Sequence, residues 1–298
     1  MSGVVLVSAL LLAAPASAGI PGPTVSLGRA GGFEYKKASL ADVVSQAGAP
    51  VLCDGGDIPT GGGGTISGSG KTAALNASYP NSGPPGDFWQ AEGRTSSTPR
   101  RETTYVICGP AALGWNNGTS PVSATGDPGD VLTLNDACLS GTELGGIRGS
   151  GGDVRILANR ATGGTGWSST VENFDDVSAS ATQYVTCTGV YEPTQRTASV
   201  QVPKGTARKA TAHCQHDEAV ISGGLASTSG GEPAISTWAT STRPWDSKDK
   251  KKTPEDGWQV KYQNDSQGGN KLKVYALCEP RAERRLTRRA SARSRPRG

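Results

Sequence analysis

The glycine-rich stretch at residues 68–72, GSGKT, resembles the end of a phosphate-binding P-loop. A P-loop requires a glycine five residues before Gly70, because the backbone of that loop cradles the phosphates of a nucleotide. Position 65 is Thr65 instead, and no strand-to-helix unit surrounds the stretch. We therefore interpret residues 68–72 as a glycine turn between two strands.

The two histidines of the chain, His213 and His216, flank Cys214. A structural zinc site needs closely spaced cysteine or histidine pairs, and the sequence contains no Cys-x-x-Cys. A hydrolytic triad would need one of these histidines as its base, and the sequence has no Gly-x-Ser-x-Gly elbow for the nucleophile. We predict a surface pair of histidines, with no metal and no cofactor.

Asp175 and Asp176 form a carboxylate pair that could serve glycosidic chemistry. That chemistry needs two carboxyl groups roughly 5 to 9 Å apart on either side of one bond. Adjacent residues of a strand point to opposite faces, so a loop tip is the simpler interpretation. We assign no catalytic residue and favour a non-enzymatic protein, with a secreted hydrolase of unrecognised type as the alternative.

A repeated skeleton organises the chain and must position any site. Its clearest copy, at residues 257–278, has a Trp, an Asn six residues later and Tyr-x-x-Cys at its end, with twenty residues from Trp to Cys. A second copy has the same spacing, and a third has nineteen residues, with Thr95 in place of the Asn. The repeated positions are Trp89, Tyr105 and Cys108; Trp167, Asn173, Tyr184 and Cys187; and Trp258, Asn264, Tyr275 and Cys278.

Each closing cysteine has an opening partner upstream that is followed by a glycine cluster. Six cysteines permit fifteen connectivities, and the repetition favours one of them. The predicted disulfides are Cys53 with Cys108, Cys138 with Cys187, and Cys214 with Cys278. Each bridge closes a loop of 49 to 64 residues and stabilises the fold by about 4 kcal/mol in the chain-entropy model.

The ends of the chain differ in composition from its middle. The apolar run before Ala16-Ser17-Ala18 reads as a secretory signal peptide and is too short for a membrane span. We divide the chain into a signal peptide (1–18), a flexible lead-in (19–32), unit 1 (33–110), unit 2 (111–190), unit 3 (191–280) and a disordered Arg-rich tail (281–298).

The composition indicates an all-β protein. Glycine accounts for 42 of 298 residues, and large helix-forming side chains are scarce. Short runs with apolar residues at alternate positions lie between Gly, Pro and Asn turns, about six in each unit. Two arrangements remain open: tandem small β-sandwiches, or a multi-sheet β-structure closed about a pseudo-threefold axis.

The aromatic residues divide into two groups. We expect the repeated Trp89, Trp167 and Trp258 to anchor the core of each unit, with Tyr105, Tyr184 and Tyr275 packed beside the closing bridges. Three tryptophans do not recur and are candidates for an exposed ligand surface: Trp115, Trp238 and Trp245.

The net charge of +4 depends on the tail. Residues 281–298 carry eight Arg and one Glu, a charge of +7, so the remainder carries −3. The tail could hold an anionic polymer through counterion release, without sequence-specific nucleic acid recognition. Candidate partners are therefore cell-wall or other anionic polymers, or a carbohydrate on the aromatic surface; the sequence leaves the oligomeric state open.

An opening Cys, Gly-Gly, Ser/Thr-x-Pro (Ser78-Tyr79-Pro80 and Thr242-Arg243-Pro244), Gly-Trp, Asn and Tyr-x-x-Cys together resemble a repeat of secreted, mostly uncharacterised actinobacterial proteins. The resemblance covers about residues 33 to 280. Unit 2 departs from it at Ala161, and unit 1 at Phe88 before Trp89. The resemblance implies export and an extracellular or cell-envelope role, and it supplies no catalytic residues.

Overall fold

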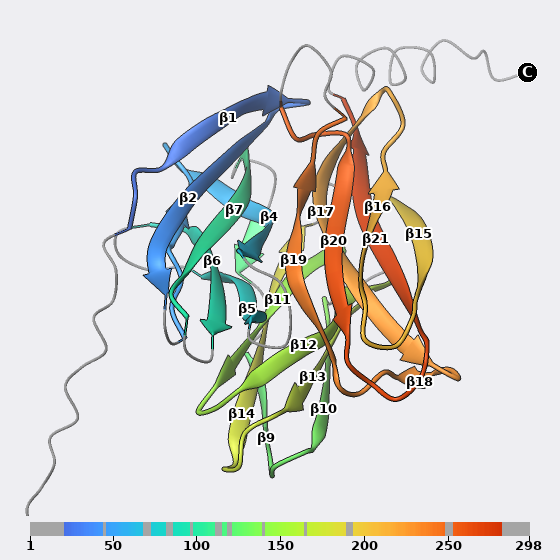
Figure 1. The fold of residues 1–298 in the computed structure, drawn as a ribbon. Coiled ribbons are helices and arrows are strands. Elements are labelled where there is room, and N and C mark those ends of the chain that lie inside the picture. The colour runs from blue at the N-terminus through green and yellow to red at the C-terminus, as the bar shows by residue number, and fades with distance from the viewer. Residues whose placement is uncertain are drawn as a thin grey trace, which may run out of the picture.

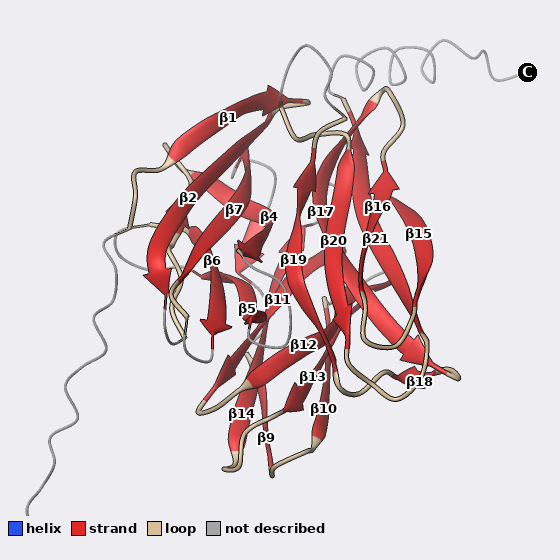
Figure 2. Cartoon of the chain, viewed as in Figure 1, coloured by secondary structure: helices blue, strands red, loops and turns tan. Residues whose placement is uncertain are grey.

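The computed structural model describes residues 21–43, 46–67, 73–81, 86–95, 98–110, 115–117, 121–138, 141–163, 166–188, 193–247 and 253–281. These residues form strands and no helix (Figure 2), which confirms the all-β fold class. The expected signal peptide, residues 68–72 and the tail beyond Arg281 lie outside the described residues.

The strands follow the three units in order. Unit 1 and the segment before it form β1 (Val25–Ala30), β2 (Phe33–Val43), β3 (Val51–Leu52), β4 (Asp57–Ile66), β5 (Ala73–Asn81), β6 (Phe88–Thr95) and β7 (Arg100–Pro110). Unit 2 forms β8 (Trp115–Asn117), β9 (Val122–Gly126), β10 (Val131–Ala137), β11 (Thr142–Ser150), β12 (Val154–Gly163), β13 (Gly166–Asn173) and β14 (Ala179–Thr188). Unit 3 forms β15 (Thr194–Val202), β16 (Ala207–His213), β17 (Glu218–Ser229), β18 (Glu232–Pro233), β19 (Thr237–Trp245), β20 (Gly257–Asn264) and β21 (Asn270–Pro280).

Strand β1 corrects our expectation of a flexible lead-in at residues 19–32. It pairs antiparallel with β2 at the edge of a sheet. The Arg29 guanidinium lies 2.9 Å from the Glu34 carboxylate, and Ser26 donates a hydrogen bond to the same side chain. These contacts fix a segment whose glycine and proline content had suggested a mobile linker.

Three seven-stranded antiparallel sheets make up the fold, and each is shared between two units. Sheet A has the order β1-β2-β7-β4-β19-β20-β16 and joins units 1 and 3. Sheet B has the order β3-β6-β5-β11-β14-β8, with β9 also paired to β14, and joins units 1 and 2. Sheet C has the order β10-β13-β12-β17-β21-β15, with β18 beside β17, and joins units 2 and 3.

The three joints, which we call seams, close the units into a ring. The unit 1/2 seam pairs β5 with β11, the unit 2/3 seam pairs β12 with β17, and the unit 3/1 seam pairs β19 with β4. Each seam consists of two residue pairs, so the strands cross rather than run side by side for long. The units therefore occupy three corners around a pseudo-threefold axis (Figure 1), which resolves the open choice against separate sandwiches.

The repeated tryptophans anchor the units as predicted. Each of the three is at most 1% exposed and lies on the inner face of its unit. Each indole packs on the first glycine of the Gly-Gly pair in the facing sheet: Trp89 on Gly62, Trp167 on Gly145, and Trp258 on Gly223. A Cβ atom at Gly62 or Gly223 would lie 2.3 Å from the indole. Glycine is therefore required there because the ring occupies the side-chain space.

The second glycine of each pair allows the seam to close. A Cβ atom on it would collide with a backbone carbonyl of the neighbouring unit, at 1.9 Å for Gly63, 2.1 Å for Gly146 and 1.9 Å for Gly224. The carbonyls belong to Thr242, Ser78 and Asn159, and the side chains of these same residues accept the indole hydrogen bonds of Trp258, Trp89 and Trp167. One residue per unit thus links a core tryptophan to the next unit.

Replacing Thr242 with valine should lower the free energy of unfolding by about 2 kcal/mol, because it leaves the buried indole N–H of Trp258 without its acceptor at 2.8 Å. Denaturant titration with the disulfides intact measures the change. Thr197→Val, at an exposed position of β15, is the matched control and should change stability by less than about 0.5 kcal/mol. Equal losses in both variants would contradict this role of Thr242.

The repeated asparagine ties two strands of its unit together. The Nδ2 groups of Asn173 and Asn264 donate to the carbonyls of Gly126 and Val202, at the ends of β9 and β15. In unit 1 the Thr95 hydroxyl donates to the carbonyl of Val43, at the end of β2. Thr95 therefore performs the same structural task with a shorter side chain, which explains the departure of unit 1 from the repeat.

Candidate functional site

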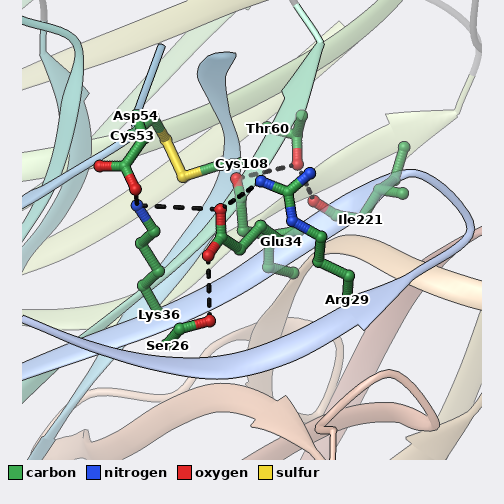
Figure 3. Close-up of a disulfide and its surroundings, with 10 residues drawn as sticks. Ser26, Arg29, Glu34, Lys36, Cys53, Asp54, Thr60, Cys108 and Ile221 are labelled. Carbon is green, nitrogen blue, oxygen red and sulfur yellow. Dashed lines mark hydrogen bonds and ion pairs between the residues drawn. A yellow bond between two sulfur atoms is a disulfide. The ribbon is translucent and has the colours of Figure 1, made fainter.

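The three predicted disulfides are present, each with a Cα–Cα distance of 5.6 or 5.7 Å. The bridge between Cys53 and Cys108 lies beside a charged cluster (Figure 3). There the buried Lys36 ammonium contacts Asp54 at 2.5 Å and Glu34 at 3.9 Å. Both carboxylates offset the cost of burying the ammonium, so we assign this cluster a structural role.

The repeated tyrosines do not pack beside the closing bridges, which corrects that expectation. Successive residues of a strand point to opposite faces, so residues three apart, such as Tyr105 and Cys108, lie on different sides of the sheet. Cys108 is buried in the same cluster as Trp89 and Val106, on the inner face. Tyr105 and Tyr184 are half-buried on the outer face, and Tyr275 is 7% exposed.

Each repeated tyrosine is covered by a side chain from the neighbouring unit. The covering residue is the middle one of the Ser/Thr-x-Pro motif or its counterpart in unit 2. Tyr79 stacks on Tyr184 with ring centroids 4.8 Å apart, whereas the Arg160 guanidinium lies 5.5 Å from the Tyr275 ring and that of Arg243 lies 5.7 Å from the Tyr105 ring. The three seams therefore share an outer tyrosine, but the unit 1/2 seam has an aromatic cover where the others have arginine.

The unit 1/2 seam also opens into a cleft of about 640 Å³, which we call the seam cleft. Polar side chains from both units line it together with backbone of residues 46–48, which bridge to β6 through Ala47 and Gly93. The side chains relevant to binding are Leu40, Gln46, Gln90 and Glu92 from unit 1, and Arg148 and Ser150 from unit 2.

Strand alternation places these side chains on the outer face. In β6, Trp89 and Ala91 face the core, so Gln90 and Glu92 face outward. In β11, Gly145 and Ile147 are buried in the core while Arg148, with a side chain 44% exposed, projects outward. The same alternation that buries the tryptophans therefore builds the floor of the seam cleft.

Glu92 is the centre of the seam cleft. Its side chain is 4% exposed and accepts hydrogen bonds from Gln46 Nε2, from Gln90 Nε2 at 3.0 Å and from the Tyr79 hydroxyl at 3.2 Å. The Arg148 Nε atom lies 3.4 Å from the same carboxylate. A buried carboxylate is stable only with such partners, and here they come from both units.

The ionisation of the surrounding groups follows from this arrangement. Burial raises the pKa of Tyr79, and the negative charge of Glu92 raises it further, so the phenol stays protonated and donates. Burial alone would lower the pKa of Arg148. The charge of Glu92 and the interactions with Tyr79 and Tyr184 outweigh burial, so the pKa of the guanidinium lies above its usual value. Glu92 and Arg148 thus form a stable, mutually neutralising pair at the base of the seam cleft.

The three unmatched tryptophans do not form a common exposed surface. Trp238 is 1% exposed, so our expectation of an exposed ring was wrong for it. Its indole donates to the Ala73 carbonyl at 3.0 Å, and the Arg155 guanidinium lies 4.3 Å from its ring centroid, so it fills the space where three units meet. Trp245 is half-buried with its ring edge-on to His213, and the side chain of Trp115 lies outside the described residues.

Of the polar motifs named from the sequence, none that the structure describes lies in the seam cleft. His213 and His216 are exposed, as expected. Asp175 lies in the turn between β13 and β14, where the backbone N–H groups of Asp176 and Asp153 hold the pKa of its carboxyl below the usual value.

Within the described residues, one group of possible metal ligands clusters within 4.8 Å, namely Cys214, Glu218 and Cys278. The two sulfurs are bonded to each other, so they are not available as thiolate ligands.

Sequence reasoning did not find Glu92, Arg148, Gln46 or Gln90. Two signals were available for the site, and the first is that the middle residue of Ser78-Tyr79-Pro80 is tyrosine where Thr242-Arg243-Pro244 has arginine. The position three residues after the repeated Trp also differs, with Glu92, Thr170 and Lys261 in the three units. A site that belongs to one seam appears in the sequence as departures from the repeat.

Comparison with known proteins gives no direct guide to function: no family model matches the chain, and no curated protein matches it. Among the described residues, no helix has the length and apolar character needed to cross a membrane.

Proposed function

We propose that this protein is secreted and acts as a non-enzymatic binding or structural protein of the extracellular space or cell envelope, with its ligand held in the seam cleft. Three disulfides fit an oxidising compartment. The apolar run at residues 1–18 and the resemblance of the repeat to secreted actinobacterial proteins support export. The closed arrangement of three units, each with its own disulfide, also presents a rigid surface, which reduces the entropic cost of binding.

The state of Glu92 is the observation that favours binding over hydrolysis. A carboxylate has about four lone-pair positions for hydrogen bonds. The Gln90 amide, the Tyr79 hydroxyl and the Arg148 guanidinium converge on Oε1, and Gln46 donates to Oε2. The whole side chain is 4% exposed, so these donors and the surrounding protein cover both oxygens. A general base or nucleophile needs an accessible lone pair directed at the substrate. The carboxylate of the seam cleft is therefore placed to organise other side chains rather than to react.

Retention of the full chain, disulfides intact, on insoluble cell-wall material and insoluble polysaccharides tests this proposal. We expect the protein to be retained without release of soluble fragments or new reducing ends over many hours. Glu92→Gln should weaken retention, because an amide cannot accept from all four donors. Turnover that the wild type shows and Glu92→Gln abolishes would instead identify the competing class, a secreted hydrolase.

A further inference from the structure

We infer that the seam cleft binds an uncharged, hydroxyl-rich chain, a neutral oligosaccharide. This inference rests on the proposed binding function and specifies its ligand class. The charged residues lining the seam cleft are Glu92 and Arg148, and they pair with each other at 3.4 Å. Their charges cancel locally, so the described residues that line the seam cleft offer no excess charge to an anionic or cationic ligand.

The hydrogen-bonding groups of the seam cleft suit hydroxyls. Gln46 and Gln90 both direct their Nε2 groups at Glu92, so their carbonyl oxygens point away from the carboxylate. Arg148 directs Nε at Glu92, and its side chain is 44% exposed. Acceptors from unit 1 and guanidinium donors from unit 2 therefore line the same cleft. A sugar hydroxyl both donates and accepts, and matches such a mixed set better than a carboxylate or a phosphate does.

The geometry of these groups is fixed before a ligand binds. Gln46 also donates from Nε2 to the Gly149 carbonyl at 2.8 Å, which links the covering segment of unit 1 to β11 of unit 2. The Arg148 guanidinium lies 5.7 Å from the centroid of the Tyr79 ring, which itself stacks on Tyr184. Pre-organised polar groups in a concave site of this volume are typical of small-ligand sites.

The other two seams provide internal controls. At the positions of Glu92 and Tyr79, the unit 2/3 seam has Thr170 and Arg160, and the unit 3/1 seam has Lys261 and Arg243. At the position of Glu92, therefore, neither of the other seams has a carboxylate to orient neighbouring side chains. The inference therefore predicts one binding site per chain, although the fold has three seams.

The test probes the intact full chain against an array of immobilised neutral and acidic oligosaccharides, followed by calorimetry with the best neutral and the best acidic binder in solution. We expect binding to neutral oligosaccharides, one site per chain, with little change in affinity between about 0.05 M and about 0.5 M salt. Arg148→Lys keeps the charge but loses the planar donors, and should weaken binding about tenfold or more. Arg160→Lys, which changes a guanidinium above a tyrosine at the unit 2/3 seam, should have no effect.

Each other outcome has a defined meaning. Binding confined to acidic oligosaccharides, salt-sensitive and weakened by Arg148→Lys, would overturn the ligand class and leave the proposed binding function standing. Binding that Arg148→Lys leaves unchanged would overturn the site. Binding to no oligosaccharide would overturn the inference, and fragment release from a bound one would overturn the proposed function. Thermal unfolding of each variant verifies that a loss of binding is not a loss of fold.

Discussion

Replacing Gly224 with alanine is expected to lower the free energy of unfolding by about 3 kcal/mol. The added Cβ would lie 1.9 Å from the Asn159 carbonyl oxygen, which belongs to the backbone of the neighbouring unit and cannot rotate away. Relief of this clash requires β12 and β17 to separate, and these strands pair through two residue pairs. The methyl group therefore acts on the closure of the ring rather than on local backbone freedom.

Guanidinium titration of the oxidised protein measures this loss, with unchanged m-values as the check that both variants unfold from the same compact state. Gly268→Ala is the matched control, because a Cβ at Gly268 has no heavy atom within 4 Å, and its effect should stay within about 0.5 kcal/mol. Alanine at Gly63 or Gly146 should act like alanine at Gly224, since the contacts are 1.9 and 2.1 Å. A stability change at Gly224 no larger than at Gly268 would show that the units do not meet this closely.

The glycine pairs also show how far the sequence could predict the fold. Fixed spacing from Trp to Cys was sufficient to predict the three disulfides and the three tryptophan anchors, because each repeat must bury the same side chains. The sequence could not predict ring closure. Gly223 and Gly224 are the same residue type in one run, although one accommodates Trp258 within its unit and the other accommodates the backbone of another unit. A missing side chain carries no information about which neighbour occupies its space.

The candidate site was less predictable than the fold for a related reason. A repeat identifies what the units share, and shared residues here are structural. Arg148 meets Glu92 and Tyr79 because units 1 and 2 are brought together at one seam, and the positions of Glu92 and Tyr79 hold residues of other types in the other two units. Trp238 shows the opposite limit: an aromatic residue that does not recur in the repeat suggests an exposed ligand surface, but this ring is buried where the three units meet.

Two buried glutamates should make the protein less stable as pH rises from about 4.5 to about 8. Burial raises the pKa of Glu102 to about 8, and the charge of Glu92 contributes to that rise. Burial raises the pKa of Glu143 to about 8 as well, with a contribution from the charge of Asp136. In this window the folded chain keeps two protons that the unfolded chain releases. The free energy of unfolding therefore falls with rising pH, by at most about 1.4 kcal/mol per pH unit for each group, and levels off above pH 8.

Glu102→Gln isolates this effect, because glutamine resembles the protonated acid and cannot ionise. Glu102 is fully buried, and its two carboxyl oxygens accept from different donors, Oε2 from the Ala49 N–H and Oε1 from the Thr104 hydroxyl. In glutamine the amide oxygen can keep the Ala49 bond, while the amide NH2 donates to the Thr104 hydroxyl, which in turn can donate to the Ala91 carbonyl. We expect the variant to match the wild type near pH 5 and to exceed its stability at pH 8, so that its pH profile is flatter. Denaturant titrations at both pH values measure this, and Glu232→Gln, at an exposed position of β18, should leave the profile unchanged. A Glu102→Gln variant that is destabilised equally at both pH values would show that the carboxyl is ionised in the folded protein, and that burial does not control its protonation.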